Sequence, residues 1–134
     1  MKNESQNGYL LLFRGTDWCE GLSPEDIQNV MSQWKAWFDR LSTQGKLKGG
    51  HPLENEGRVV SGKRGRVIAD GPFAESKEAV GGYFFLSVST LDEALAIAKE
   101  CPGLEHGAIV EVRPVAAVCP AMAALEESQL TATA

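Results

Sequence analysis

The sequence predicts one α+β domain, a ferredoxin-like antiparallel sheet that carries two helices on one face and a β-hairpin insertion. The first observation is the segment order, which is strand, helix, strand, hairpin, strand, helix, strand. This order contains two β-α-β units with a β-insertion between them. The second is composition, because 134 residues with 43% hydrophobic and 23% charged side chains are typical of a single folded domain. We expect the domain to span residues 8–115 and an Ala-rich tail to span 116–134.

A strand and a long helix open the domain. Residues 9–13 are a continuous apolar run of strand length, and turn residues follow them. Ser23 and Pro24 then supply a helix cap and a first helical position. The helix is expected to reach about Leu41, with one apolar stripe made of Ile27, Val30, Met31, Trp34, Trp37, Phe38 and Leu41. Such a stripe is more typical of a core-facing helix than of a cofactor site.

Glycine and proline shape the middle of the chain. We expect a bent or edge strand around Gly49, Gly50 and Pro52, because glycine weakens a strand interior and proline lacks a backbone donor. The apolar pairs on either side of the turn-rich segment 61–65 predict the hairpin.

The second half repeats the strand-helix-strand pattern. Residues 82–88 give the strongest strand signal, because aromatic and apolar residues dominate them. Thr90 and Glu93 form a capping box that begins the second helix. Its expected inward stripe is Leu91, Ala94, Leu95 and Ala98. Residues 108–113 predict the final strand, and the tail beyond it is either a short helix or largely unordered.

The second face of the sheet also needs a cover. A sheet covered on one side alternates apolar and polar residues, yet residues 9–13 and 83–86 are apolar on both sides. Either a second copy of the chain packs there, giving a homodimer with a barrel-like interior, or the tail and the hairpin fold over it. We favour the dimeric α/β barrel, because a large exposed apolar patch usually marks association.

The net charge of the chain argues against some classes of binding partner. Thirteen basic and eighteen acidic side chains give a net charge of −5, which argues against direct nucleic-acid binding and against an anionic membrane surface. Lys63, Arg64 and Arg66 could guide a small anion or could be the solvated tip of the hairpin. No segment approaches the roughly 20 apolar residues of a membrane helix. Residues 1–8 lack a signal-peptide core, so we expect a cytoplasmic location.

Cysteine and histidine spacing gives no metal signature. Cys19, Cys101 and Cys119 are odd in number and form no C-x-x-C pair, so we expect reduced thiols. They also form no zinc-like set with His51 and His106. No His-x-His or Glu-x-x-His spacing and no phosphate-binding glycine loop is present. We therefore predict neither a metal nor a cofactor.

The segment 70–78, Asp-Gly-Pro-Phe-Ala-Glu-Ser-Lys-Glu, is the richest in information. Pro72 fixes its own backbone and restricts the glycine before it, while Asp70 can bind backbone amides downstream. One interpretation is a purely structural corner, with Phe73 pinned to the core. The other is that the corner presents side chains to a cleft, namely Asp70, Glu75 and Lys77.

This segment, followed by Gly81-Gly82-Tyr83, resembles the signature of the YCII-related domain family, in the branch marked by Asp-Gly-Pro-Phe. The resemblance extends over residues 8–115. Further matching runs are Leu10-Leu11-Leu12, Leu22-Ser23-Pro24-Glu25, Gly49-Gly50-His51-Pro52-Leu53, Cys101-Pro102-Gly103 and Ile109-Val110-Glu111-Val112-Arg113-Pro114.

The resemblance implies a ferredoxin-like fold that pairs as a dimeric α/β barrel. Most members have no assigned activity, and members of this branch are often encoded beside extracytoplasmic-function sigma factors. A distant relative is a dehydrochlorinase-like enzyme of chloroaromatic breakdown. A catalytic His-Asp pair has been proposed in shorter relatives, where the histidine comes early. This chain has no histidine before His51, so that pair does not transfer by position.

His51 and Asp70 are the catalytic candidates on chemical grounds, because an imidazole oriented by a carboxylate is a common general acid/base near neutral pH. His51 could equally be a strand-end residue with satisfied hydrogen bonds. Arg14 could bind an anionic substrate group or pair with Asp17 or Glu75. The predicted substrate-binding residues are Arg14, Phe73, Glu75 and Lys77.

These features support two functional hypotheses and a plainer third one. The first is a protein that binds an unidentified small molecule in a pocket near the dimer interface, in a regulatory role linked to a sigma factor. The second is a small-molecule enzyme, a lyase or dehydrochlorinase-like protein, that uses His51 and Asp70. The third is a structural dimer module. We rank binding slightly above catalysis, because no motif specifies a reaction.

Overall fold

The computed structural model describes residues 7–71 and 79–133, with side chains described as far as residue 128. Its elements in chain order are β1 (Tyr9–Arg14), α1 (Pro24–Thr43), β2 (Leu47–Pro52), β3 (Arg58–Ser61), η1 (Lys63–Gly65), β4 (Val67–Asp70), β5 (Val80–Leu86), α2 (Leu91–Ala98), η2 (Pro102–His106), β6 (Ile109–Pro114) and α3 (Pro120–Thr133). The two η elements are short 3₁₀ turns.

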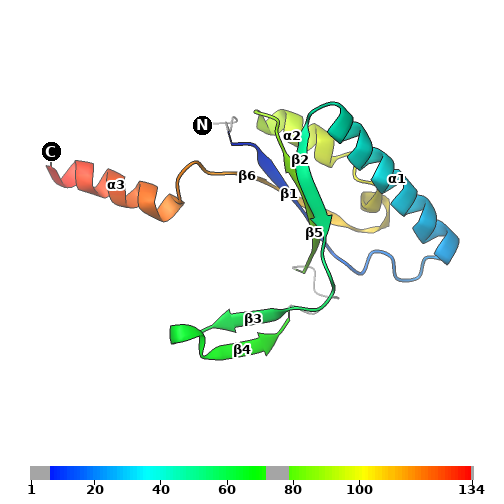
Figure 1. Ribbon diagram of the computed structural model, residues 1–134, viewed down its shortest axis with the longest axis horizontal. Helices are drawn as coiled ribbons and strands as arrows, with labels where there is room; N and C mark the ends of the chain where they lie inside the picture. Colours follow the sequence, from blue (N-terminus) through cyan, green and yellow to red (C-terminus); the bar gives the residue numbers. More distant parts are fainter. Residues whose placement is uncertain (1–6, 72–78, 134) are drawn as a thin grey trace.

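A four-stranded antiparallel sheet forms the body, in the order β2-β5-β1-β6. Helices α1 and α2 lie together on one side of this sheet, as Figure 1 shows. The predicted α+β architecture is thus confirmed. The sheet of the single chain is open and does not close into a barrel. The paired barrel remains a prediction.

Local sequence signals explain where the two body helices begin. The Ser23 hydroxyl accepts a hydrogen bond from the Asp26 amide at 3.1 Å, as expected for an N-cap. Thr90 caps α2 in the same way, accepting from the Glu93 amide at 3.2 Å. The predicted inward stripe of α2 is wrong at Leu95, which is 38% exposed. Ile97 is buried in its place, because residues at three- and four-residue spacing from Ala94 face the sheet.

The core lies between the helix layer and one face of the sheet. Alternate residues of β1 point into it, since side chains on a strand alternate between faces. Its buried members are Tyr9, Leu11, Phe13, Trp37, Leu41, Phe84, Leu86, Val88, Ala94, Ile97, Ala98 and Cys101.

The other face of the sheet, here called the open face, carries the intervening residues. Leu10 and Leu12 on β1 lie beside Phe85 and Tyr83 on β5, and all four are half-buried. The prediction that these strands are apolar on both sides is confirmed.

Two elements project from the body. Strands β3 and β4 form a separate two-stranded sheet, the predicted hairpin, and all eight of their residues are exposed. Helix α3 extends from the opposite end of the molecule, as Figure 1 shows, and residues 119–128 are exposed. The tail is therefore helical, which decides between the two predicted alternatives. Within the described residues, no helix is both long and apolar enough to span a membrane.

Candidate functional site

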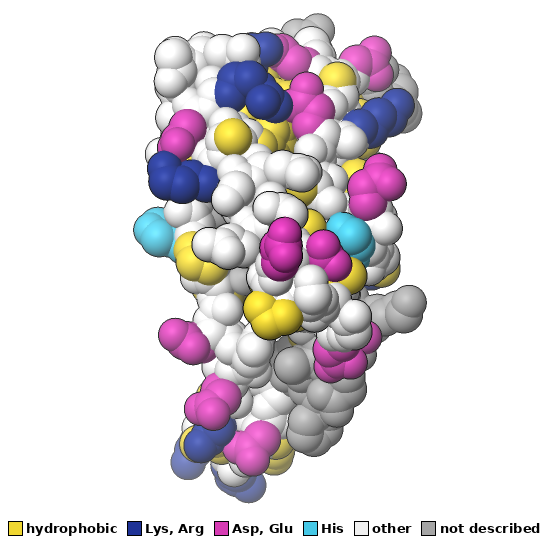
Figure 2. All heavy atoms as spheres, turned by 90° about the vertical axis from the view of Figure 1, so that its right-hand side faces the viewer, with side chains coloured by type: hydrophobic (Ala, Val, Ile, Leu, Met, Phe, Trp, Pro, Cys, Tyr) yellow, Lys and Arg dark blue, Asp and Glu magenta, His cyan; other side chains and the backbone are white. Residues whose placement is uncertain are grey.

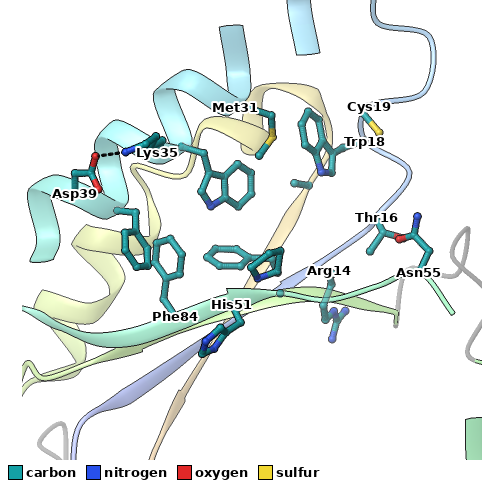
Figure 3. Close-up of a pocket in the computed structure, with 18 residues that line it drawn as sticks. Arg14, Thr16, Trp18, Cys19, Met31, Lys35, Asp39, His51, Asn55 and Phe84 are labelled. Carbon is teal, nitrogen blue, oxygen red and sulfur yellow. Dashed lines mark hydrogen bonds and ion pairs between the residues drawn. The ribbon is translucent and has the colours of Figure 1, made fainter. Parts of the chain in front are cut away.

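The main cleft lies between α1 and the ends of β2 and β5, with a cavity volume of about 650 Å³. Its walls are mostly aromatic or apolar, and Figure 3 shows them between the helix and the strands. The large apolar lining residues are Phe13, Trp18, Met31, Trp34, Phe38 and Phe84. Thr16, Lys35, Asp39 and Asn55 are polar residues at its edge. Arg14 and His51 also border the cleft, although Figure 3 shows their side chains on the other side of the strands. A volume and lining of this kind are typical of small-molecule sites.

Glycines create the space under α1. Gly82 follows the same alternation as Phe84 and faces the helix, but it contributes no side chain. Gly50 pairs with Phe84 across the sheet. A Cβ at Gly50 would lie 2.8 Å from Cδ1 of Phe84 and 2.7 Å from the Tyr83 carbonyl oxygen, closer than packing allows. Gly50 therefore lets Phe84 pack closely here, and the glycines line the cleft opposite the large side chains of α1.

The aromatic walls hold one another in place. The Trp34 ring lies 5.0 Å from Phe13 in an edge contact and 6.0 Å from Trp18 in a near-parallel stack, between ring centroids. Phe84 contacts Phe13 at 4.8 Å and Phe38 at 5.3 Å, both edge-on. Such pairs add about 0.5–1.5 kcal/mol each beyond simple burial. The cleft walls are thus preformed and present both ring faces and ring edges.

The rim of the cleft is charged on its helical side. Lys35 and Asp39 form an ion pair of 2.8 Å one helical turn apart on α1. Both side chains are more than half exposed, so the pair contributes little to stability. Either partner is free to exchange this contact for a polar group on a bound molecule, because the exposed pair is weak.

On the open face, the reactive side chains form a different group. Nδ1 of His51 lies 2.7 Å from the Tyr83 hydroxyl, its direct neighbour across the sheet. Nη1 of Arg14 pairs with Glu111 at 3.0 Å. Nε of Arg14 is buried and has no hydrogen-bond partner within the part of the chain that the structure describes. In Figure 3 the His51 ring and the Arg14 guanidinium lie on the side of the strands away from α1.

Comparison with known proteins identifies the fold family. The sequence model of the YCII-related domain matches residues 9–118, most of the chain. The chain belongs to the YCII-related domain family. An uncharacterized protein of Rhizobium meliloti (strain 1021) is 38% identical over 55 residues, which are 40% of this chain and 44% of that protein. The chain therefore matches under half the length of this curated relative, whose name assigns no activity.

The predicted catalytic residues of this YCII-related domain lie on different elements. His51 is on the edge strand β2 and bonds to Tyr83. Asp70 ends β4 of the projecting hairpin, where its carboxylate pairs with Arg58 at 2.9 Å. The described contacts therefore do not join His51 to Asp70. Their pairing in catalysis stays a prediction.

The predicted binding residues are only partly described. Within the described residues, Arg14 forms an ion pair with Glu111, a carboxylate that the sequence analysis did not consider. The physical reason is register, because β1 and β6 run side by side and bring the two side chains to the same open face. Phe73, Glu75 and Lys77 lie outside the described residues.

Sequence reasoning missed the cleft residues of the YCII-related domain. Trp34 and Phe38 pack against the core as predicted, but they also line the cleft, and Met31 lines it while 47% exposed. The available signal was the run of glycines in the facing strands, since large side chains opposite glycine pairs leave a gap. Tyr83 was likewise read only as a strand residue. Its partnership with His51 depends on a cross-strand register that composition does not reveal.

The thiols differ in reactivity by position. All three cysteines are free, with Cys101 buried and Cys119 exposed. Burial raises the pKa of the Cys101 thiol to about 11, against weaker lowering by the backbone amides of Gly103 and Leu104. Cys101 is therefore a core thiol and not a nucleophile. Within residues 7–71 and 79–133, no three His, Cys, Asp or Glu side chains group together as metal ligands.

Proposed function

We propose that this YCII-related domain binds a small, mainly apolar molecule with an aromatic ring in the cleft between α1 and the sheet. The observation that carries the proposal is the preformed aromatic lining of an approximately 650 Å³ cavity. Aromatic rings recognise other rings by stacking and by edge contacts, and both arrangements occur among the walls. The rim pair Lys35 and Asp39 would orient one polar substituent of the ligand.

Thermal shift with matched probes tests this proposal. 2-Naphthol should raise the melting temperature more than octanol, because only the former has ring faces. A ligand at about 100 times its Kd stabilises a protein by about 2.7 kcal/mol. Met31→Arg should remove the shift, since Met31 lines the cleft and is 47% exposed. Gln33→Arg, an exposed position of α1 that does not line the cleft, is the matched control.

The result that would refute binding is equally direct. If neither probe shifts the melting temperature, or if Met31→Arg and Gln33→Arg behave alike, the cleft is not the binding site. Crystals soaked with 2-naphthol would then show whether the probe lies elsewhere.

The role of such binding is proposed to be regulatory. The family resemblance links this branch to extracytoplasmic-function sigma factors, and ligand occupancy would then change an interaction with such a factor. Native mass spectrometry of the protein mixed with extracytoplasmic-function sigma factors of its own organism is the test. Absence of a complex, with and without ligand, would count against this role.

A second candidate function is acid/base catalysis on the open face. The 2.7 Å contact between His51 and Tyr83 favours it, because a tyrosine hydroxyl can orient an imidazole that moves a proton. For a dehydrochlorinase-like reaction, His51 would take a proton from the carbon beside the C–Cl bond. The electron pair would form a C=C bond as chloride leaves.

Chloride release from chlorinated cyclic substrates tests the enzyme alternative. His51→Gln should abolish turnover. Asp70→Asn and Tyr83→Phe separate two arrangements. Loss of turnover in Asp70→Asn would support the predicted pair of His51 and Asp70. Unchanged turnover in Asp70→Asn, with loss of turnover in Tyr83→Phe, would support the contact between His51 and Tyr83. No release from any substrate by the wild type would argue for binding alone.

We further propose that two copies pair through their open faces. The support is the row of half-buried apolar residues on that face, including Leu10, Leu12 and Phe85. A second open face would cover them as a sheet-on-sheet layer, which is the barrel-like arrangement that the family resemblance implies.

A further inference from the structure

The hairpin β3–β4 is an arm whose apolar side chains are exposed. Directly opposed residues share a face, so Val60 and Ile68 lie together on one side of the arm. These two side chains are 62% and 66% exposed. On the other side, Val59 and Val67 are 44% and 51% exposed. An isolated two-stranded hairpin is at best marginally stable in water, so the arm needs a packing partner.

Helix α3 is likewise expected to be only marginally stable without a packing partner. It has 14 residues, a length at which a helix without packing is marginal in water. Met122 and Leu125 are each 49% exposed and lie three residues apart, on one side of the helix. Val118, just before the helix, is also 49% exposed. The chain therefore carries two projecting elements with exposed apolar side chains.

The two elements have opposite charge. The arm, residues 58–70, has four basic side chains and one acidic, a net charge of 4 − 1 = +3. Arg58 pairs with Asp70 within it. Lys63, Arg64 and Arg66 at the tip form no ion pair within the described residues. Figure 2 shows several Lys and Arg side chains at the lower end of the molecule, with Asp and Glu side chains beside them.

Helix α3 is negatively charged, opposite to the arm. It contains Glu126 and Glu127 and no lysine or arginine. The rest of the chain outside the arm has nine basic and seventeen acidic side chains, so the arm is the cationic exception in an acidic protein. An arm that is apolar and cationic fits a surface that is apolar and anionic. This chain presents one on α3.

We propose that the β3–β4 arm of one protomer docks on α3 of a second copy of the same chain. Val60 and Ile68 would pack on Met122 and Leu125, and the basic tip would face Glu126 and Glu127. In a two-fold dimer the contact occurs twice, because each copy gives an arm and receives one. In Figure 1, the arm and α3 both point away from the helix layer, toward the side where the second copy would sit. The exchange would add to open-face pairing and is independent of ligand binding in the cleft.

Reciprocal charge reversal in the full chain tests the exchange. Sedimentation velocity would measure the dimer dissociation constant of the wild type, of Arg64→Glu/Arg66→Glu, and of Glu126→Lys/Glu127→Lys. Each double variant should weaken the dimer by about tenfold or more, because attraction becomes like-charge repulsion. The quadruple variant should return to within about threefold of the wild type, since both signs are exchanged.

A control of equal net charge excludes a general charge effect. The quadruple variant keeps the wild-type net charge of −5, and so does Arg64→Glu/Arg66→Glu combined with Glu20→Lys/Glu105→Lys, at exposed positions off α3. Only the α3 combination should rescue dimerisation. The proposal is overturned if the wild type is monomeric, if arm reversal leaves the dimer unchanged, or if both combinations rescue equally. Near-native circular dichroism of each variant is required, since a misfolded variant would not regain affinity on further reversal.

Discussion

The two faces of the four-stranded sheet are made by the same strands but have different properties. On the covered face, Leu11 and Phe84 are buried and the cleft opens only where glycines leave room. On the open face, the neighbours of these residues include Arg14, His51 and Tyr83, which bear the reactive groups. Because successive side chains of a strand point to opposite faces, core residues and polar reactive residues alternate along the same strand. Four sets of substitutions test how complete this separation is.

The largest difference is expected from neighbouring leucines on β1. Leu11→Ala should lower the free energy of unfolding by about 2–5 kcal/mol, because Leu11 is fully buried and its loss leaves a cavity. Leu12→Ala, on the open face, should lower it by about 1 kcal/mol or less in the monomer. Urea denaturation at low protein concentration measures both. Equal losses would show that the two faces are equally buried in solution.

A second difference is expected between the paired glycines of β2. Gly50→Ala should destabilise the protein by about 1–3 kcal/mol, because the new methyl group would overlap the Tyr83 carbonyl and the Phe84 ring. Gly49→Ala meets nothing within 4 Å and should be neutral or stabilising by up to about 1 kcal/mol. Differential scanning calorimetry of the two variants decides. If Gly50→Ala leaves the stability unchanged, the Phe84 ring and the Tyr83 backbone can move to accommodate the methyl group.

The free energy of unfolding should also depend on pH through a buried thiol of the core. The raised pKa of Cys101 favours its neutral thiol in the folded state, so this contribution to stability is present below pH 9 and is lost as the pH rises toward 11. We expect a loss of about 1–3 kcal/mol across this window. Cys101→Ala should remove that part of the pH dependence in urea titrations. The same slope in both proteins would contradict the assignment.

The smallest effect is expected on the open face. Tyr83→Phe removes the hydrogen bond to His51 but leaves the ring, so the free energy of unfolding should fall by about 1 kcal/mol or less. Equilibrium denaturation is the measurement. Trp37→Phe is a useful comparison on the covered side, because buried Trp37 donates to Glu100 at 3.1 Å and should be more costly to shorten. A larger loss from Tyr83→Phe would show that the open face contributes to folding.

Most of the fold was predictable because its signals are local. The Ser23 and Thr90 caps, the helical stripe of α1 and the glycine-rich hairpin tip depend on residues a few positions apart. The strand 82–88 was placed two residues late, since β5 spans Val80–Leu86. Its glycines weaken the signal at its start.

The candidate site was less predictable because its contacts are distant in sequence. Arg14 and Glu111 are 97 residues apart and meet only through the pairing of β1 with β6. His51 and Tyr83 meet across the edge of the sheet. Glycines, which have no side chains, line one side of the cleft. A pattern of apolar residues in the sequence does not reveal such a gap.

The clustering of tryptophans has a practical consequence. Trp18, Trp34 and Trp37 are all the tryptophans of the chain, and Trp34 lies 6.0 Å from each of the others. Indole rings this close couple electronically, so the tryptophan emission of the protein originates from one place. Trp18 and Trp34 border the cleft, so a ligand bound there as proposed would change the emission of the unmodified protein.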